Sequence, residues 1–384
     1  LTALYAFQQE GWRELLSLSS AENGSIAVCL LGVSLMFRQD GLMDLAGLAW
    51  TVSLLHLAGH ALAKAAMFLT ADGVYRRVRD YALVQRGILT GSSWIFGLGA
   101  LFAAMSLAAM PPQAGFVSEW YLFQTFFQGF HLSSLASRLT AALAGAGLAL
   151  TAAIAFATFI KAYGIGLLGR MERSNSAIPI PNEIAVGVLG ALVLALAVGM
   201  PVWLTGLEPV VLQTFGTSAA AHMHSDWLLV PLTAKFAFIS PSKLVIAMPL
   251  LALIPVALLL ISRRRPMRVA PVWYGGREQD PRRSTTTALT FSNALRTFYS
   301  FIYRPTVETE REQAAEGNGQ PYFTRRLVFT HDVAPIFGPY LFGPLEKLTR
   351  LLAYRLRIIQ SGHLNFYLAL IGILLVGILI VALI

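Results

Sequence analysis

The chain has 384 residues, of which 56% are hydrophobic and only 13% are charged. A soluble globular protein carries about 25% charged residues, so this composition excludes that class and predicts an all-α polytopic membrane protein. The formal net charge is +9, but the arginines gather between apolar stretches and therefore indicate membrane topology rather than a nucleic-acid surface.

Cofactor-binding motifs are not found along the sequence. The single cysteine, Cys29, excludes disulfides and cysteine-ligated iron–sulfur clusters within this chain. No Rossmann glycine fingerprint and no phosphate loop occur. We therefore expect the chain to bind no cofactor of its own.

The first residues predict a helix end and one membrane span. Residues 1–14 are expected to hold the end of a preceding helix and a polar link, so we expect the chain to be the C-terminal part of something longer. Residues 15–205 are expected to form a transmembrane core, which begins with a span over Leu15–Phe37. Glu22 lies near one end of that span, and is either a proton acceptor, a partner for a lysine, or a carboxylate at the level of the lipid headgroups.

The next apolar segment, Leu45–Thr70, carries three ionisable residues at a helical spacing. His56, His60 and Lys64 stand at i, i+4 and i+8, so on a helix they form one stripe with about 6 Å per step. Ionisable groups inside a membrane segment are costly and are by default functional. Imidazole takes and gives protons near neutral pH, so the stripe predicts a proton relay.

Two other interpretations of the stripe remain open. In the first, the three residues have only a structural role and form hydrogen bonds with neighbouring polar groups. In the second, the two histidines bind a metal ion together. The metal is disfavoured because the only carboxylates close in sequence are Asp44 and Asp72. We expect no metal site.

A broken helix is predicted after a further span over Ser92–Ala109. The sequence Met110–Trp120 contains residues that interrupt a helix, namely Pro111, Pro112 and Gly115. Broken helices beside an ionisable residue build ion sites at depth in transporters, so Glu119 is a candidate relay residue. The alternative is an N-terminal carboxylate favoured by the helix dipole. We expect the broken segment to cross the membrane.

Two more apolar segments complete the predicted core. Thr140–Leu168 is expected to be a long helix in which Lys161 either belongs to the relay or extends to the membrane interface. Glu183–Leu204 is a further span. Residues 206–262 are expected to hold a loop, with a weak metal hint at His222 and His224, and one additional span.

The remainder is expected to lie mostly outside the membrane. Residues 263–362 form a basic extramembrane region that contains an amphipathic helix over Pro344–Gln360, suited to the membrane surface or to a partner. Residues 363–384 form the last of about eight transmembrane helices.

Four stretches resemble a known family: Ser19–Gly24, Leu54–Phe68, Met110–Trp120 and Phe159–Arg170. They are similar to the antiporter-like, proton-conducting membrane subunits of complex I, of Mrp-type Na⁺/H⁺ antiporters and of membrane-bound hydrogenases. Within that family the chain most resembles the hydrogenase-4 component B group, also called formate hydrogenlyase subunit 3. The resemblance covers nearly the whole chain.

The resemblance implies a fold and a site. The family fold has two inverted five-helix repeats, each with a broken helix, and this chain corresponds to the second repeat. The family's hydrophilic axis implies that His56, His60 and Lys64 form the central relay and that Glu119 exchanges protons with one side. Glu22 and Lys161 match polar positions of the family less securely.

The sequence also departs from the family. The first repeat, with its glutamate and lysine, is absent, and Arg13 stands where relatives often have a lysine. Arginine does not release its proton readily, so it cannot replace a titrating lysine. Either the chain is a fragment, or a second polypeptide supplies the missing half, or transport has been lost.

The resemblance implies a membrane subunit of an oxidoreductase complex of the NADH:quinone or hydrogenase type. It would translocate protons, without a redox cofactor of its own, in a bacterial inner membrane. Its expected partners are other membrane subunits, soluble Fe–S and hydrogenase or dehydrogenase subunits, and the lipid bilayer, with no nucleic acid. The alternatives are an Mrp-type Na⁺/H⁺ antiporter subunit and a truncated membrane anchor that does not pump.

Overall fold

The computed structural model describes residues 1–169, 177–233, 237–262, 275–276, 285–313, 324–357 and 362–383. The chain divides into two compact units, Leu1–Ala294 and Leu295–Ile384, which are described separately below. The division of the chain into five segments, 1–14, 15–205, 206–262, 263–362 and 363–384, remains a prediction from the sequence. Of the first part of the predicted basic region, residues 263–284, only 275–276 are among the described residues.

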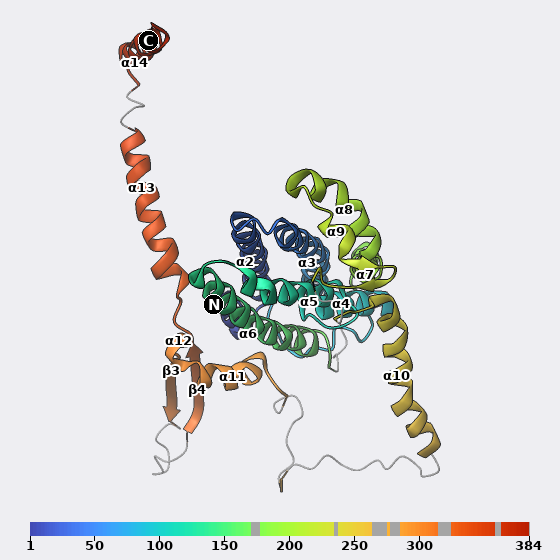
Figure 1. The fold of residues 1–384 in the computed structure, drawn as a ribbon. Helices are drawn as coiled ribbons and strands as arrows, with labels where there is room; N and C mark the ends of the chain where they lie inside the picture. The colour runs from blue at the N-terminus through green and yellow to red at the C-terminus, as the bar shows by residue number, and fades with distance from the viewer. Residues whose placement is uncertain are drawn as a thin grey trace. The chain divides into compact units, whose positions relative to one another are not determined.

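The first unit consists mainly of helices (Figure 1). They are α1 (Thr2–Gln8), α2 (Trp12–Gln39), α3 (Met43–Val78), α4 (Trp94–Leu107), α5 (Ala114–Phe127), η1 (Gln128–His131), α6 (Leu135–Gly166), α7 (Ile180–Val198), α8 (Met200–Phe215), α9 (Ala219–His222) and α10 (Pro241–Ser262). Helix α11 (Ala288–Phe298) runs across the boundary between the units.

Six helices among the described residues are long and apolar enough to cross a membrane: α2, α3, α6, α7, α10 and α14 (Leu364–Leu383). The expected number was about eight, and the difference comes from α4 and α5. Each has 14 residues, which at 1.5 Å per residue gives about 21 Å against a hydrocarbon thickness of about 30 Å. Neither half of the broken segment therefore spans a bilayer as a single helix.

Several predicted boundaries differ from the structure. Helix α3 continues to Val78, eight residues beyond the predicted end at Thr70, and Asp72 and Arg76 form an i, i+4 ion pair of 2.6 Å in that extension. The predicted span Glu183–Leu204 is divided between α7 and α8 at Gly199. Pro201 stands in the first turn of α8, where a proline costs no helical hydrogen bond.

Helix α3 is central in the first unit. It contacts α2, α4, α5, α7, α8 and α9, and it lies between α2 and α7 in Figure 1. Small residues permit the closest approach in this core. A Cβ on Gly99 of α4 would lie 2.4 Å from the carbonyl oxygen of Val186 in α7, so only glycine fits there.

Strands correct the expectation of an all-α chain. In the second unit, β3 (Thr306–Gln313) pairs antiparallel with β4 (Thr324–Asp332), with Val307 opposite His331 and Thr309 opposite Phe329. The central residues Val328, Phe329 and Thr330 of β4, and Val307 and Thr309 of β3, are of the β-branched and aromatic types that favour strands. In the first unit, β1 (His224–Ser225) and β2 (Leu228–Leu229) form a minimal hairpin.

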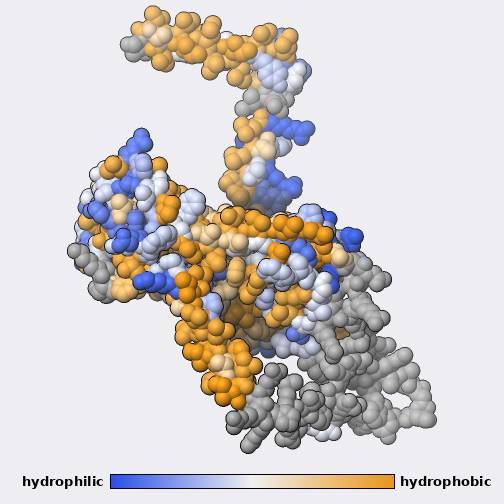
Figure 2. Space-filling model, turned by 90° about the vertical axis from the view of Figure 1, so that its right-hand side faces the viewer, coloured by the Kyte–Doolittle hydropathy of each residue, from blue (hydrophilic) through white to orange (hydrophobic). Residues whose placement is uncertain are grey.

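The other elements of the second unit are α12 (Ser300–Tyr303), η2 (Gly338–Phe342), α13 (Gly343–Arg357) and α14. Helix α13 overlaps the predicted segment Pro344–Gln360 over Pro344–Arg357. Its leucines at 345, 348 and 352 are exposed, and α14 exposes almost all of its apolar side chains. In the space-filling view of Figure 2, apolar residues likewise cover the surface of α10.

Candidate functional site

The predicted stripe lies on α3, in the interior of the first unit. His56 is 3% exposed and Lys64 is 5% exposed, and His60 is half-buried. The two imidazole rings are nearly parallel, with an interplanar angle of 15° and 6.5 Å between their centroids. The sequence spacing therefore places the three side chains in order along one helix, as predicted.

Lys64 connects the stripe to α2 and α6. Its Nζ donates a hydrogen bond of 3.0 Å to the carbonyl oxygen of Leu16 and lies 5.2 Å from the centroid of the Phe159 ring. A carbonyl and an aromatic face both stabilise an ammonium group out of water. The lysine is therefore held at a fixed position in the core.

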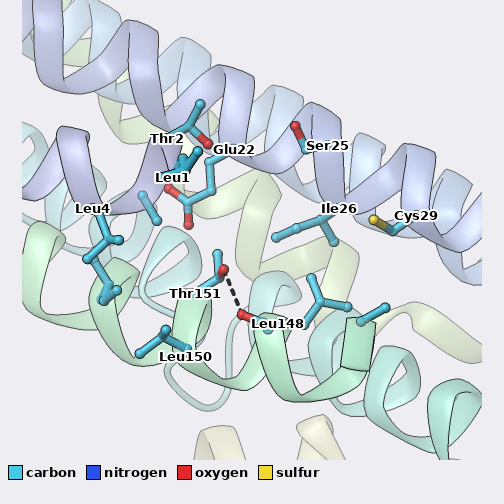
Figure 3. A pocket seen from close by; sticks show the side chains of 14 residues that line it. Leu1, Thr2, Leu4, Glu22, Ser25, Ile26, Cys29, Leu148, Leu150 and Thr151 are labelled. Carbon is cyan, nitrogen blue, oxygen red and sulfur yellow. Dashed lines mark hydrogen bonds between the residues drawn. The ribbon is translucent and has the colours of Figure 1, made fainter. Parts of the chain in front are cut away.

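Glu22 of α2 is close to this lysine. Its side chain is 4% exposed, and it interacts electrostatically with Lys64. This contact agrees with the predicted alternative in which Glu22 is the partner of a lysine. Glu22 also lines a cavity of about 480 Å³, together with hydroxyl groups of Thr2, Ser25 and Thr151, and Figure 3 shows its carboxylate pointing into that cavity.

The helix is interrupted at the predicted prolines, whereas Gly115, which was also expected to interrupt it, lies inside α5. Helix α4 ends at Leu107 and α5 begins at Ala114, with Pro111 and Pro112 in the connection. The last turn of α4 closes as a Schellman motif, since the Met110 N–H bonds to the Met105 carbonyl at 2.8 Å. Gly115 is the second residue of α5, and its N–H donates to Ser106 Oγ at 3.0 Å.

Glu119 is half-buried and lies on α5 beyond its first turn. A helix dipole acts mainly within the first turn, so the dipole does not account for this carboxylate. Glu119 lines a narrow apolar pocket and interacts electrostatically with Glu22. Ile26 and Leu148 line both this pocket and the larger cavity at Glu22, so the two carboxylates face adjacent spaces.

A serine that the sequence reasoning assigned no role joins the stripe to the broken helix. Ser118 Oγ lies 3.1 Å from His56 Nδ1, and Ser118 immediately precedes Glu119. The only sequence signal was its place in the motif Gly115–Trp120, which does not indicate a histidine contact. Together, α2, α3 and α5 bring Glu22, His56, His60, Lys64 and Glu119 into one region.

Lys161 has a different environment from the other five residues. It is fully buried on α6, so it does not extend to an exposed surface. It donates hydrogen bonds to the carbonyl oxygens of Phe7 and Gln9 and to Ser292 Oγ, the last at 3.1 Å. The lysine thereby stabilises the C-terminal end of α1, where helical carbonyls need donors.

Two further sequence expectations concern residues near the ends of the core. Arg13 stacks on the Tyr81 ring at 4.4 Å from its centroid and is exposed, so it lies away from the buried stripe. Among the described residues, no group of three or more histidine, cysteine or acidic side chains is arranged to hold a metal ion. The loop that contains His222 and His224 is connected to α5 by a hydrogen bond, because the Tyr121 hydroxyl donates to the Met223 carbonyl at 2.5 Å.

Comparisons with known proteins relate the chain to membrane ion-transport subunits. Residues 1–144 match the family described as NADH:quinone oxidoreductase/Mrp antiporter, TM. Hydrogenase-4 component B of Escherichia coli is 26% identical over 381 residues, which are 96% of this chain and 55% of the relative. Formate hydrogenlyase subunit 3 of Escherichia coli is 31% identical over 203 residues, which are 51% of this chain and 32% of the relative.

A solved structure shares the fold. A chain of the membrane-bound sulfane sulfur reductase, described as an archaeal respiratory membrane complex, superposes with a TM-score of 0.56 at 18% identity, covering 98% of this chain and 53% of that chain. This chain spans about half the length of hydrogenase-4 component B. The predicted antiporter-like membrane fold and the predicted resemblance to hydrogenase-4 component B are thus confirmed, and residues 1–144 carry the family match.

Proposed function

We propose that this chain is a proton-conducting membrane subunit of a redox-driven complex of the hydrogenase or complex I type. The observation that carries the proposal is the meeting of Glu22, Lys64, His60, His56 and Glu119 in the core of one helical unit. Buried ionisable groups in a membrane segment mark ion pathways and proton relays. The hydrogenase-4 component B resemblance supports a hydrogenase-type complex as the setting.

In this proposal the proton moves along α3 and then to α5. Lys64 exchanges with His60, His60 with His56, and Glu119 exchanges the proton with one side of the membrane. Each group is an acid or base whose charge changes when it gains or loses the proton, so a charge change at one site alters the proton affinity of the next. Electron transfer in partner subunits would supply the initial change in charge.

The assembly follows from the same resemblance. We propose that residues 15–205 correspond to the second inverted repeat of the family fold, and that other membrane subunits and soluble Fe–S and hydrogenase or dehydrogenase subunits complete the complex in a bacterial inner membrane. In α13, exposed leucines accompany Lys347, Arg350 and Arg355 on the same helix. Such a helix fits an anionic membrane surface or an acidic partner.

The test uses the purified complex that contains this chain, reconstituted into liposomes, with proton uptake followed by a fluorescent pH indicator during electron transfer. Lys64→Ala and Glu119→Gln should each abolish proton uptake while the subunits still assemble. Lys243→Ala and Glu14→Gln, which change exposed residues of the same types, should pump as the unmodified complex does. Normal pumping in either relay variant would refute the proposal.

The same preparation separates the alternatives. An Mrp-type antiporter would exchange Na⁺ for H⁺ without electron transfer and would not co-purify with Fe–S or hydrogenase subunits. A structural anchor would co-purify with them, and Lys64→Ala would not change proton flux because there would be none to lose.

A further inference from the structure

Ser118 makes two polar contacts that together fix the state of a histidine. Its side chain is 1% exposed, and its Oγ–H donates to the carbonyl oxygen of Gly115 at 3.0 Å. The same oxygen lies 3.1 Å from His56 Nδ1. A serine hydroxyl has one proton to donate, and the Gly115 carbonyl can only accept. Both contacts are satisfied at once when the hydroxyl donates to the Gly115 carbonyl and His56 Nδ1 carries a proton that it donates to Ser118.

The other nitrogen of the same imidazole is left free to react. His56 Nε2 is buried and has no hydrogen-bond partner among the described residues. A neutral imidazole with a proton on Nδ1 has its lone pair on Nε2. The nitrogen that accepts a proton is thus the one that no neighbouring side chain occupies. His60 Nδ1 is also buried without a hydrogen-bond partner among those residues, on the parallel ring one turn along α3.

The broken helix determines where Ser118 stands. The Gly115 N–H donates a hydrogen bond to Ser106 Oγ at the end of α4, and this bond fixes the position of Gly115. The carbonyl of the same glycine accepts the hydrogen bond from Ser118. On the other side, a Cβ on Gly59 of α3 would lie 3.1 Å from Ala114 Cβ, so α3 and α5 are in close contact one turn from His56. Glycine at these positions lets the serine reach the imidazole.

We propose that Ser118 is a positioning residue that holds His56 in the Nδ1–H tautomer, so that His56 exchanges protons through Nε2. Hydrogen bonds to one imidazole nitrogen commonly decide which nitrogen is protonated in this way. The tautomer follows from the contacts alone, whereas its role in proton exchange rests on the proposed function. The two parts are therefore tested by separate readouts.

The tautomer is read by solid-state NMR on the complex in bilayers, with ¹⁵N-labelled histidine at neutral pH. The chain has seven histidines, so the His56 signals are assigned as those missing in His56→Gln. Unmodified protein should show a protonated Nδ1 and an unprotonated Nε2. Ser118→Ala should shift the population toward the Nε2–H form, and Ser118→Thr, which keeps the hydroxyl, should restore the original signals.

The matched control is Thr125→Ala. Thr125 is a fully buried hydroxyl residue on the same helix, but its Oγ1 donates to the Tyr121 carbonyl at 2.8 Å, and among the described residues no hydrogen bond links it to a histidine. This variant should leave the His56 signals unchanged. In proton-uptake assays Ser118→Ala should lower the rate about tenfold, at the lower end of the 10- to 100-fold losses seen when the partner that orients a metal-bound histidine is removed.

Each result has a defined meaning. An unprotonated Nδ1 in the unmodified protein overturns the tautomer assignment, and so does an unchanged spectrum in Ser118→Ala. The unmodified protein alone decides the first point, even where a variant fails to fold. If the spectra agree with expectation while Lys64→Ala and Ser118→Ala both pump normally, the proposed function fails and the tautomer assignment stands.

Discussion

Gly115→Ala provides the sharpest test of how the broken helix is packed. A Cβ at position 115 would lie 1.8 Å from the carbonyl oxygen of Ser106 and 2.7 Å from its carbonyl carbon. Ordinary contacts begin near 3.4 Å, so the two segments would have to separate by about 1.6 Å, which is 3.4 minus 1.8. Both atoms belong to the backbone at the end of α4, and neither can rotate away.

The energetic cost follows from that overlap. Overpacking in a close-packed core costs roughly 1–3 kcal/mol, and a backbone clash belongs at the upper end of this range. The same movement would carry Ser118 with it. Its contact with His56 Nδ1 is already 3.1 Å long, so a shift of this size breaks the hydrogen bond and the variant should lose proton uptake as well as stability.

The assay is the apparent melting temperature of the detergent-solubilised complex at one fixed heating rate, because large membrane proteins unfold irreversibly. The control is Gly32→Ala in the interior of α2, where a Cβ would meet no atom within 4 Å. Alanine is favoured over glycine inside a helix by roughly 0.5–1 kcal/mol, so this control should melt at or slightly above the unmodified protein. If Gly115→Ala melts as the control does, the described approach of α4 and α5 is wrong.

Three other outcomes are expected. Lys64→Met should abolish proton uptake and lower stability in thermal unfolding, by at most the roughly 3–5 kcal/mol lost when one partner of a buried charge pair is removed, because the buried carboxylate of Glu22 is left without the opposite charge; Lys64→Met combined with Glu22→Gln should recover that stability without recovering uptake, and an unchanged melting temperature in the single variant would contradict the pairing. Tyr121→Phe should destabilise by roughly 0.5–1.5 kcal/mol, the net value of a typical hydrogen bond, and should increase proteolysis of the loop at Met223; an unchanged cleavage rate would contradict the tether. The Ala82 N–H, which lies 3.0 Å from the Asp80 carboxylate, and the Arg86 guanidinium hold the pKa of Asp80 below its ordinary value. The carboxylate therefore contributes stability above about pH 4, and this contribution is lost as the pH falls through the lower pKa of the folded state. Asp80→Asn should flatten that part of an acid-unfolding curve.

Features that depend on local sequence were predictable. Helical periodicity placed His56, His60 and Lys64 on one stripe, and the double proline marked the interruption between α4 and α5. Both rest on rules that act over a few residues, namely 3.6 residues per turn and the missing N–H of proline.

Contacts between residues that are far apart in the sequence could not be predicted. Ser118 and His56 are 62 positions apart, and Lys161 and Phe7 are 154 positions apart. One sequence contains no signal for such contacts, because many serines and carbonyls are chemically equivalent until the helices pack. The hairpin of β3 and β4 was missed for a different reason, because neither strand shows the clean alternation of apolar and polar residues by which a strand is recognised in a sequence.

The two connections between Lys64 and Glu119 are chemically unequal. On one side, His60, His56 and Ser118 offer nitrogen and oxygen atoms that hold or exchange protons, and the last of them adjoins Glu119 in sequence. On the other side, Glu22 interacts with both Lys64 and Glu119, but hydroxyl groups line only the cavity at Glu22, and the narrow pocket at Glu119 is lined otherwise by apolar side chains such as Ile26 and Leu148. Aliphatic side chains pass no protons, whereas the field of a charge acts across them at the low dielectric of the interior. We therefore infer that the proton moves along the α3 stripe and that the charge of Glu22 controls when Glu119 releases it.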